Sequence, residues 1–182
     1  MRPVLIKTVF SGFGGQGVLM MGYVLAVAGM HEGKNVTYLP AYGAEVRGGT
    51  ANCTVAIADE EIASPVASSP EFVVVMNEPS LERFQNVIQS GGGLFLNASM
   101  IDGRPTRGDI EVFEIPANDL VRPLGNDRLT NMVMLGAYLA RTRVVSLELM
   151  EKAVEDIFKA KKGKAMVTQN RKALTIGYEY TM

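Results

Sequence analysis

Apolar runs and helix-like patterns alternate along the chain, which predicts an α/β fold. Short apolar runs bounded by Gly, Pro or polar residues are typical of strands, and longer segments with apolar residues every three or four positions are typical of helices. We expect strands at 4–10, 35–39, 52–58, 71–76, 93–98 and 110–115. We expect helices at 15–32, 79–89, 117–123, 129–142, 146–160 and 166–178. Such alternation indicates a mostly parallel sheet flanked by helices. No linker or repeat divides residues 1–182, so we expect a single domain.

Two of the expected helices have no polar face. Residues 18–30 and 132–140 carry apolar or small side chains on almost every side. A helix on the outside of an α/β sheet should have one apolar stripe and one polar face. We therefore expect a partner subunit to cover part of this surface, and the 11 methionines agree with an interface. The alternative is that both helices lie inside one large core.

The composition is that of a globular protein. Of 182 residues, 47% are hydrophobic and 20% charged, with a net charge of −1. The basic residues are scattered, which argues against a nucleic-acid partner. No apolar run reaches the ~18 residues that a membrane-spanning helix needs. The first residues lead directly into a strand pattern without a signal peptide, so we expect a soluble, cytoplasmic protein with no membrane contact.

The usual catalytic and metal-binding arrangements are missing from the sequence. Cys53 is the single cysteine, and we expect it to be a small buried apolar residue with no metal or iron–sulfur role. His31 is the single histidine and ends the first helix, where we expect it to cap the helix or favour its dipole. The acidic run 59–61 is typical of a solvated turn. No nucleophile elbow, P-loop or zinc motif occurs.

The segment between the first strand and first helix is rich in glycine. Gly12, Gly14 and Gly17 fit the spacing G-x-G-x-x-G in the strand–turn–helix context that the motif requires. Glycine permits the tight turn and close approach of a ligand, and the helix N-terminus favours an anion such as phosphate. Gln16 could contact that anion or cap the backbone. The alternative is a purely structural tight turn.

A Rossmann-like fold is the expectation from this motif, but an NAD(P) site is not. Such a site needs an acid at the end of the second strand to hold the ribose. Here the strand ends in Pro40-Ala41, and the nearest later acid is Glu45. Another phosphate-bearing ligand, or none, is therefore favoured.

A second glycine-rich loop follows the second strand, at residues 39–52. It contains Tyr42, Gly43, Glu45, Arg47, Gly48 and Gly49. We expect both loops at the carboxyl ends of adjacent strands, where open α/β sheets bind ligands. Arg47 could hold a phosphate or carboxylate, pair with Glu45, or contact another subunit. Tyr42 could contact a ligand, although a half-buried packing role is favoured. For Asn131, before the second apolar helix, capping is favoured over ligand contact.

Together the two motifs, G-x-G-G-Q-G and Y-G-x-E-x-R-G-G, closely resemble the gamma subunit of 2-oxoacid:ferredoxin oxidoreductases. In single-chain pyruvate enzymes of this family the equivalent is an internal gamma domain. The likeness extends through residues 62–65, 72–77, 94–97 and 131–137 to Asn170, Ala173 and Gly177. The resemblance implies a non-autonomous subunit, residues 1–182, of a complex that oxidatively decarboxylates a 2-oxoacid to acyl-CoA and reduces ferredoxin.

The resemblance also implies how the cofactors are divided. Thiamine diphosphate and iron–sulfur clusters would reside in thiamine-binding and ferredoxin-like sister subunits, and this chain would help to receive coenzyme A, which needs no acid at the second strand. The short chain favours 2-oxoglutarate; pyruvate, indolepyruvate and branched-chain 2-oxoacids are alternatives. A regulatory or scaffold domain that binds a phosphate ligand is the alternative of a different class. The resemblance gives no catalytic residue and carries cofactor binding to Gly12, Gly14, Gly15, Gln16, Gly17, Tyr42, Gly43, Glu45, Arg47, Gly48 and Gly49.

Overall fold

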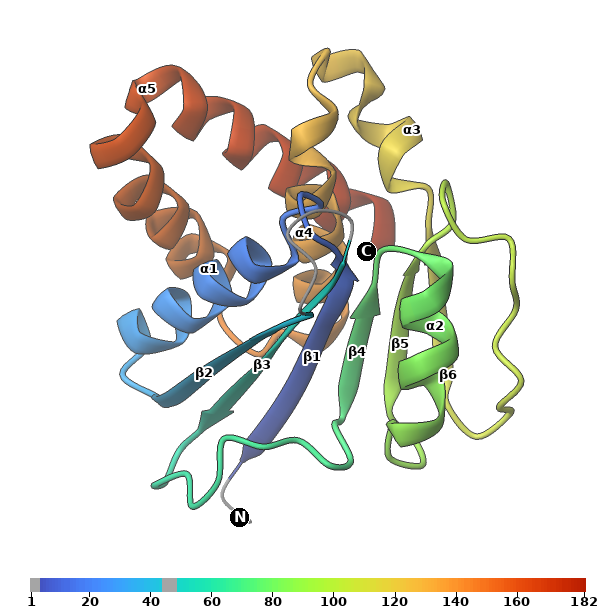
Figure 1. The fold of residues 1–182 in the computed structure, drawn as a ribbon. Helices are drawn as coiled ribbons and strands as arrows, with labels where there is room; N and C mark the ends of the chain where they lie inside the picture. Colours follow the sequence, from blue (N-terminus) through green and yellow to red (C-terminus); the bar gives the residue numbers. More distant parts are fainter. Residues whose placement is uncertain (1–3, 44–48) are drawn as a thin grey trace.

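A six-stranded sheet forms the centre of the molecule (Figure 1). The computed structural model describes residues 4–43 and 49–182, without the side chains of 160–162. The strand order is β2-β3-β1-β4-β5-β6. The strands are β1 (Leu5–Phe13), β2 (Asn35–Tyr42), β3 (Thr50–Ala58), β4 (Phe72–Val75), β5 (Gly93–Asn97) and β6 (Glu111–Ile115).

The sheet is mixed but mostly parallel. β1, β4, β5 and β6 pair in parallel, whereas β3 is antiparallel to both of its neighbours, β1 and β2. β2 therefore runs in the same direction as β1. The expectation that the two glycine-rich loops follow adjacent strands is wrong, because β3 lies between β1 and β2. β2 and β3 pair with each other in antiparallel orientation. β3 also pairs with β1, in a register that runs from Leu5↔Ala58 to Phe13↔Thr50.

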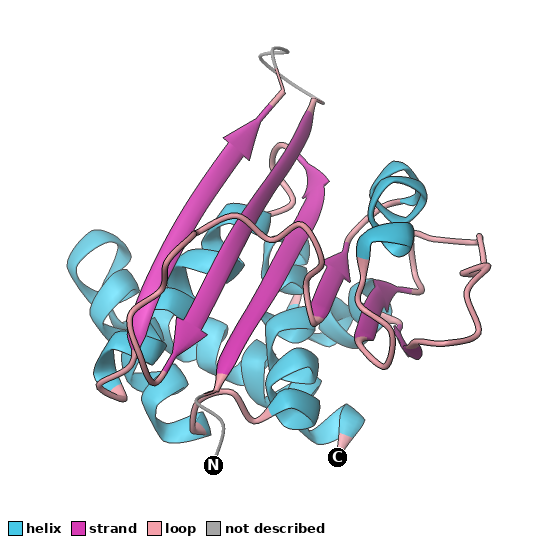
Figure 2. Cartoon of the chain, turned by 90° about the horizontal axis from the view of Figure 1, so that it is seen from below, coloured by secondary structure: helices cyan, strands magenta, loops and turns pink. Residues whose placement is uncertain are grey.

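Helices cover the two faces of the sheet unequally (Figure 2). α1, α4 and α5 cover one face, while α2 and the connection 59–71 lie on the other. α5 bends at Gly163 (φ 76°, ψ 176°), so it comprises two helical arms where the sequence predicts helices at 146–160 and 166–178. The helices are α1 (Val18–His31), α2 (Glu78–Phe84), α3 (Ala117–Val121), α4 (Thr130–Thr142) and α5 (Leu147–Thr181), with 3₁₀ turns η1 (Gln85–Val87), η2 (Arg122–Leu124) and η3 (Asp127–Leu129).

The apolar helix α4 is enclosed within this one chain. Every residue from Thr130 to Ala140 is buried. Tyr138, at its centre, shares a hydrogen bond with Thr8 of β1 (2.7 Å between the hydroxyl oxygens). Gly136 faces α5 so closely that a Cβ there would overlap the carbonyl oxygen of Leu174. The expectation that a partner subunit covers α4 is therefore wrong, because the sheet and α5 already cover it.

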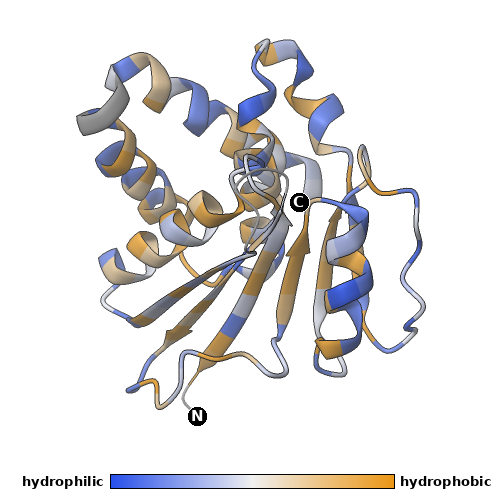
Figure 3. Ribbon diagram, viewed as in Figure 1, coloured by the Kyte–Doolittle hydropathy of each residue, from blue (hydrophilic) through white to orange (hydrophobic). Residues whose placement is uncertain are grey.

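α1 is partly open to solvent. Most of its apolar side chains are buried, but Tyr23 is 43% exposed and Met30 67% exposed. Colouring by hydropathy shows hydrophobic stretches on α1 and along the strands (Figure 3). The surface left for a partner on this helix is thus limited to a few side chains. Among the described residues, no helix is both long and apolar enough to span a membrane.

Candidate functional site

The glycine-rich segment is a strand end, a tight turn and a helix start. β1 continues through Gly12 to Phe13, so the turn itself is 14–17. Gly12 permits close packing, since a Cβ there would lie 2.6 Å from Oε1 of Gln16 and 2.9 Å from Cβ of Met76. Gly15 (φ 100°) and Gly17 (φ 74°) have left-handed backbone conformations, which only glycine adopts at little cost.

Gln16 fixes the turn through its side-chain amide. Its Oε1 accepts hydrogen bonds from the backbone N–H of Phe13 (2.7 Å) and from Nδ2 of Asn77 (3.2 Å). Its Nε2 donates to the carbonyl oxygen of Met76 (3.2 Å). Of the two roles considered for Gln16, the structure shows the backbone cap. The turn after β1 is thereby joined to the segment that follows β4.

No side chain from the described part of the chain caps the N-terminus of α1. Gly17 is its N-cap residue, and its first turn contains no acid. Asn131 donates from Nδ2 to the carbonyl oxygen of Gly17 (3.2 Å). The expected capping role of Asn131 is therefore wrong, because its amide reaches α1 instead of its own helix. The partial positive charge of this helix end is left for an anion.

A cavity of about 250 Å³ lies beside the turn. It borders the carboxyl ends of β1, β4 and β5, the position at which open α/β sheets bind ligands. Its walls offer amide, hydroxyl, guanidinium and carboxylate groups, the last from Asp127, but no histidine or cysteine, so they are suited to binding and not to nucleophilic chemistry. The lining residues are Gly15, Gln16, Met76, Asn97, Met100, Asn118, Asp127, Arg128 and Thr130.

Sequence reasoning missed the polar residues across the cavity from the turn. Asn97 is 1% exposed and donates from Nδ2 to Oδ1 of Asn118 (2.8 Å). The sequence did contain a signal for Asn97, because it is the polar residue that ends the apolar strand β5. Arg128 is exposed and carries the one positive charge among the lining residues. No motif marks Arg128, because it is contributed by the short turn η3.

The ends of the second glycine-rich loop meet the turn. The N–H of Gly14 donates to the carbonyl oxygen of Gly49 (3.0 Å), and the N–H of Gly43 donates to that of Thr50 (2.8 Å). Tyr42 is 70% exposed, so the expected packing role is wrong within this chain. Glu45, Arg47 and Gly48 lie outside the described residues. The structure thus brings both glycine-rich segments to one edge of the sheet.

The single cysteine and histidine lie away from this cavity. Cys53 is fully buried, and burial raises the pKa of its thiol to about 12. An inert, buried Cys53 agrees with the sequence expectation. Nε2 of His31 lies 2.9 Å from Oδ2 of Asp156 in α5 and has no hydrogen-bond partner in the described part of the chain. His31 therefore faces α5 and does not cap α1, since the backbone of Glu32 caps that helix instead.

Comparison with known proteins decides the family. The pyruvate ferredoxin/flavodoxin oxidoreductase family matches the chain over residues 7–180. The chain belongs to this family. The ketoisovalerate oxidoreductase subunit VorA of Methanothermobacter thermautotrophicus is 34% identical over 96% of this chain, which spans only 36% of that relative. The 2-oxoglutarate synthase subunit KorC of Methanocaldococcus jannaschii is 30% identical, covering 93% of this chain and 90% of KorC.

A solved structure shares the fold. The crystal structure of the keto/oxoacid ferredoxin oxidoreductase gamma subunit from Geobacter sulfurreducens PCA superimposes with a TM-score of 0.85. The two chains are 27% identical, and the match covers 98% of this chain and 97% of that one. The mixed sheet flanked by helices is therefore the gamma-subunit fold.

Proposed function

We propose that this chain is the non-autonomous gamma subunit, residues 1–182, of a 2-oxoacid:ferredoxin oxidoreductase complex. The observation that carries the proposal is family membership over residues 7–180, together with the gamma-subunit fold. The complex would decarboxylate a 2-oxoacid, join the acyl group to coenzyme A and pass two electrons to ferredoxin.

The chain's own residues support a binding role and not a redox one. Iron–sulfur clusters are held by several cysteine thiolates, and this chain has a single cysteine. That cysteine is buried in the core, away from the cavity at the turn. Thiamine diphosphate and the clusters would therefore reside in thiamine-binding and ferredoxin-like sister subunits, where they supply the carbon and electron chemistry. This chain would position the acceptor of the acyl group.

The proposed ligand at the turn is coenzyme A. Gly14 is exposed, and among the described residues a Cβ there would have only the carbonyl oxygen of Gly49 within 4 Å, which supports close approach of a phosphate to the backbone. The open N-terminus of α1 favours its charge, and Arg128 at the rim can form a forked pair with its oxygens. Glu45 and Arg47 belong to a loop whose end at Gly49 touches the turn. We propose that these two residues act on the ligand or beside the thiamine site of the complex.

The substrate proposed first is 2-oxoglutarate, the substrate named for the KorC relative. Ketoisovalerate, named for VorA, is the second candidate. No residue lining the cavity recognises one 2-oxoacid side chain in an identifiable way. Comparing turnover of both acids, with pyruvate as a third, decides between them.

Affinity purification from the native cells tests the proposal. A tagged chain is expected to bring down thiamine-binding and ferredoxin-like subunits in constant ratio, in a brown, iron-containing complex that reduces a dye when a 2-oxoacid and coenzyme A are added. A scaffold or regulatory domain would bring down partners without iron or turnover, and that result would overturn the proposal.

A further inference from the structure

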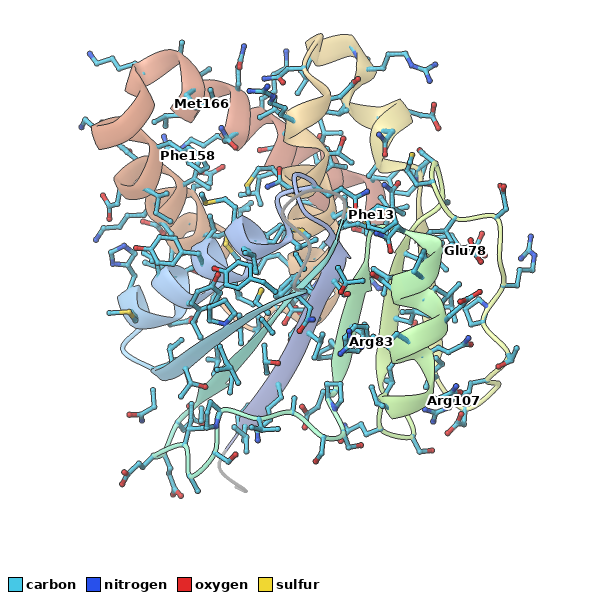
Figure 4. All side chains as sticks on the ribbon, viewed as in Figure 1. Phe13, Glu78, Arg83, Arg107, Phe158 and Met166 are labelled. Atoms are coloured by element: carbon cyan, nitrogen blue, oxygen red, sulfur yellow. The ribbon has the colours of Figure 1, made fainter. Side chains whose placement is uncertain are left out.

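A second cavity lies under the bend of α5. It has a volume of about 360 Å³, within the range of sites for small organic ligands. The first turn of α1, η3, the start of α4 and both arms of α5 enclose it. Figure 4 labels Phe158 on one arm of α5 and Met166 on the other. Arg128 is the only lining residue that this cavity shares with the one at the glycine-rich turn.

Two buried asparagine side chains line this space. Asn131 is 6% exposed, and its Oδ1 has no hydrogen-bond partner in the described part of the chain, while its Nδ2 is committed to Gly17. Asn170 is 3% exposed, and its Nδ2 donates to the carbonyl oxygen of Met166 (2.8 Å). Oδ1 of Asn131 is therefore the buried acceptor left for a ligand, and Asn170 adds a second amide to the lining. A buried oxygen without a donor is costly, so an occupant that supplies N–H groups is favoured.

The remaining walls suit a flat aromatic group. Phe158 contributes a phenyl ring, and Met20 and Met166 contribute polarizable thioethers that pack well on ring systems. The guanidinium of Arg128 stands on the side toward the turn, where it would favour an attached anion. An aminopurine nucleotide combines these features: a flat ring system, an exocyclic amino group that donates, and a phosphate.

We propose that the cavity under α5 binds the purine base of a nucleotide, with Arg128 on its phosphate. The amino group of the base would donate to Oδ1 of Asn131. A free nucleotide and the nucleotide end of coenzyme A share this chemistry. If the source is coenzyme A, the inference rests on the proposed function, and the base would lie under α5 with its phosphates extending past Arg128 to the glycine-rich turn.

Titration calorimetry of the full chain with three probes tests the proposal: ADP, GDP and adenosine 3′,5′-bisphosphate, the nucleotide end of coenzyme A. At least one is expected to bind with a dissociation constant below about 1 mM. A preference for the bisphosphate points to coenzyme A, and a preference for ADP or GDP points to a free nucleotide. Nucleotide binding by the isolated chain requires no sister subunit. If no probe binds, the proposed role in the oxidoreductase complex still stands. If the chain proves not to belong to such a complex, nucleotide binding can still occur.

Variants locate the binding. Arg128→Ala and Phe158→Ala should each weaken it by about tenfold or more. Arg83→Ala, on α2 at the opposite face of the sheet, should not change it (Figure 4). If Phe158→Ala does not fold, Met20→Ala, at a half-buried position, replaces it. No binding of any probe by a chain that unfolds cooperatively on heating would overturn the proposal, as would wild-type affinity in both Phe158→Ala and Met20→Ala.

Discussion

Asn131 donates a hydrogen bond to the carbonyl oxygen of Gly17 across 114 residues of sequence, and its amide packs directly against the Cα of that glycine. The contact joins the start of α4 to the N-cap of α1. Because α4 is enclosed by the sheet and α5, it provides a rigid support for the turn. The helix end at which we propose that a ligand binds is therefore held from the centre of the fold.

Asn131→Ala should destabilise the chain. The substitution removes one of the two hydrogen bonds that the part-buried Gly17 carbonyl accepts and leaves the one from the N–H of Met21, a loss of about 0.5–1.5 kcal/mol in the free energy of unfolding. Urea denaturation followed by circular dichroism measures it. Asn86→Ala, at an exposed position, is the matched control and should stay within about 0.5 kcal/mol of the wild type. Equal stability of the two variants would remove Asn131 as the support of the turn.

Gly17→Ala should lower the free energy of unfolding by more than Gly33→Ala does. Both glycines have similar positive φ values, 74° and 76°, so both variants incur the left-handed backbone penalty of roughly 1–2 kcal/mol. At Gly33 the space is open, whereas a Cβ at Gly17 would overlap Nδ2 of Asn131. Overpacking should raise the cost at Gly17 to about 2–4 kcal/mol. Thermal and urea unfolding of the pair measure the difference, and equal costs would show that Asn131 moves aside freely.

Gly14→Val should affect coenzyme A and not folding. A Cβ at Gly14 meets nothing closer than 3.8 Å, and the position lies on the open side of the turn. A valine would therefore obstruct a ligand's approach to the backbone while leaving the core intact. In the assembled complex, the apparent KM for coenzyme A should rise about tenfold or more, with the KM for the 2-oxoacid unchanged. Gly108→Val, in an exposed connection with open space, is the control. An unchanged coenzyme A KM would leave the turn a structural feature only.

Cys53 should be unreactive until the chain unfolds. Burial raises its thiol pKa from 9.0 to about 12, so the native protein keeps the proton where the unfolded chain loses it. The contribution of the Cys53 thiol to the free energy of unfolding is fully present below pH 9 and declines as the pH rises from 9 toward 12. Alkylation by iodoacetamide at a pH of about 8.5, close to the ordinary thiol pKa, should be slow in buffer and fast in urea. Fast alkylation of the folded chain would show that Cys53 is accessible, and Cys53→Ala supplies the blank.

The local patterns of the sequence predicted each strand and helix to within a few residues, but not how the strands pair. β1 and β2 each have the expected hydrophobic pattern, yet nothing local to either indicates that β3 lies between them. The same limit applies to α4: a helix without a polar face has the same pattern whether a partner or its own chain covers it. Here the close contact of Gly136 with Leu174 shows that α5 is the cover.

The sequence predicted only part of the candidate site, because local patterns do not show which distant segments meet in the fold. Gly12 to Gly17 could be recognised because turn geometry depends on residues adjacent in sequence. Asn131, Asn97 and Arg128 come from three other segments, and only the fold brings them to the turn. The capping role expected for Asn131 followed from its position at a helix start, a local rule that its contact with Gly17 overrides.

Reconstitution of turnover tests the central proposal most directly. The complex is expressed with and without this chain, and 2-oxoacid-dependent, coenzyme A-dependent reduction of ferredoxin is measured before and after the purified chain is added. We predict no turnover from the chain alone, none from the complex that lacks it, and recovery when the two are mixed. Turnover by the isolated chain, or full activity of the complex without it, would contradict its role as a required, non-autonomous subunit.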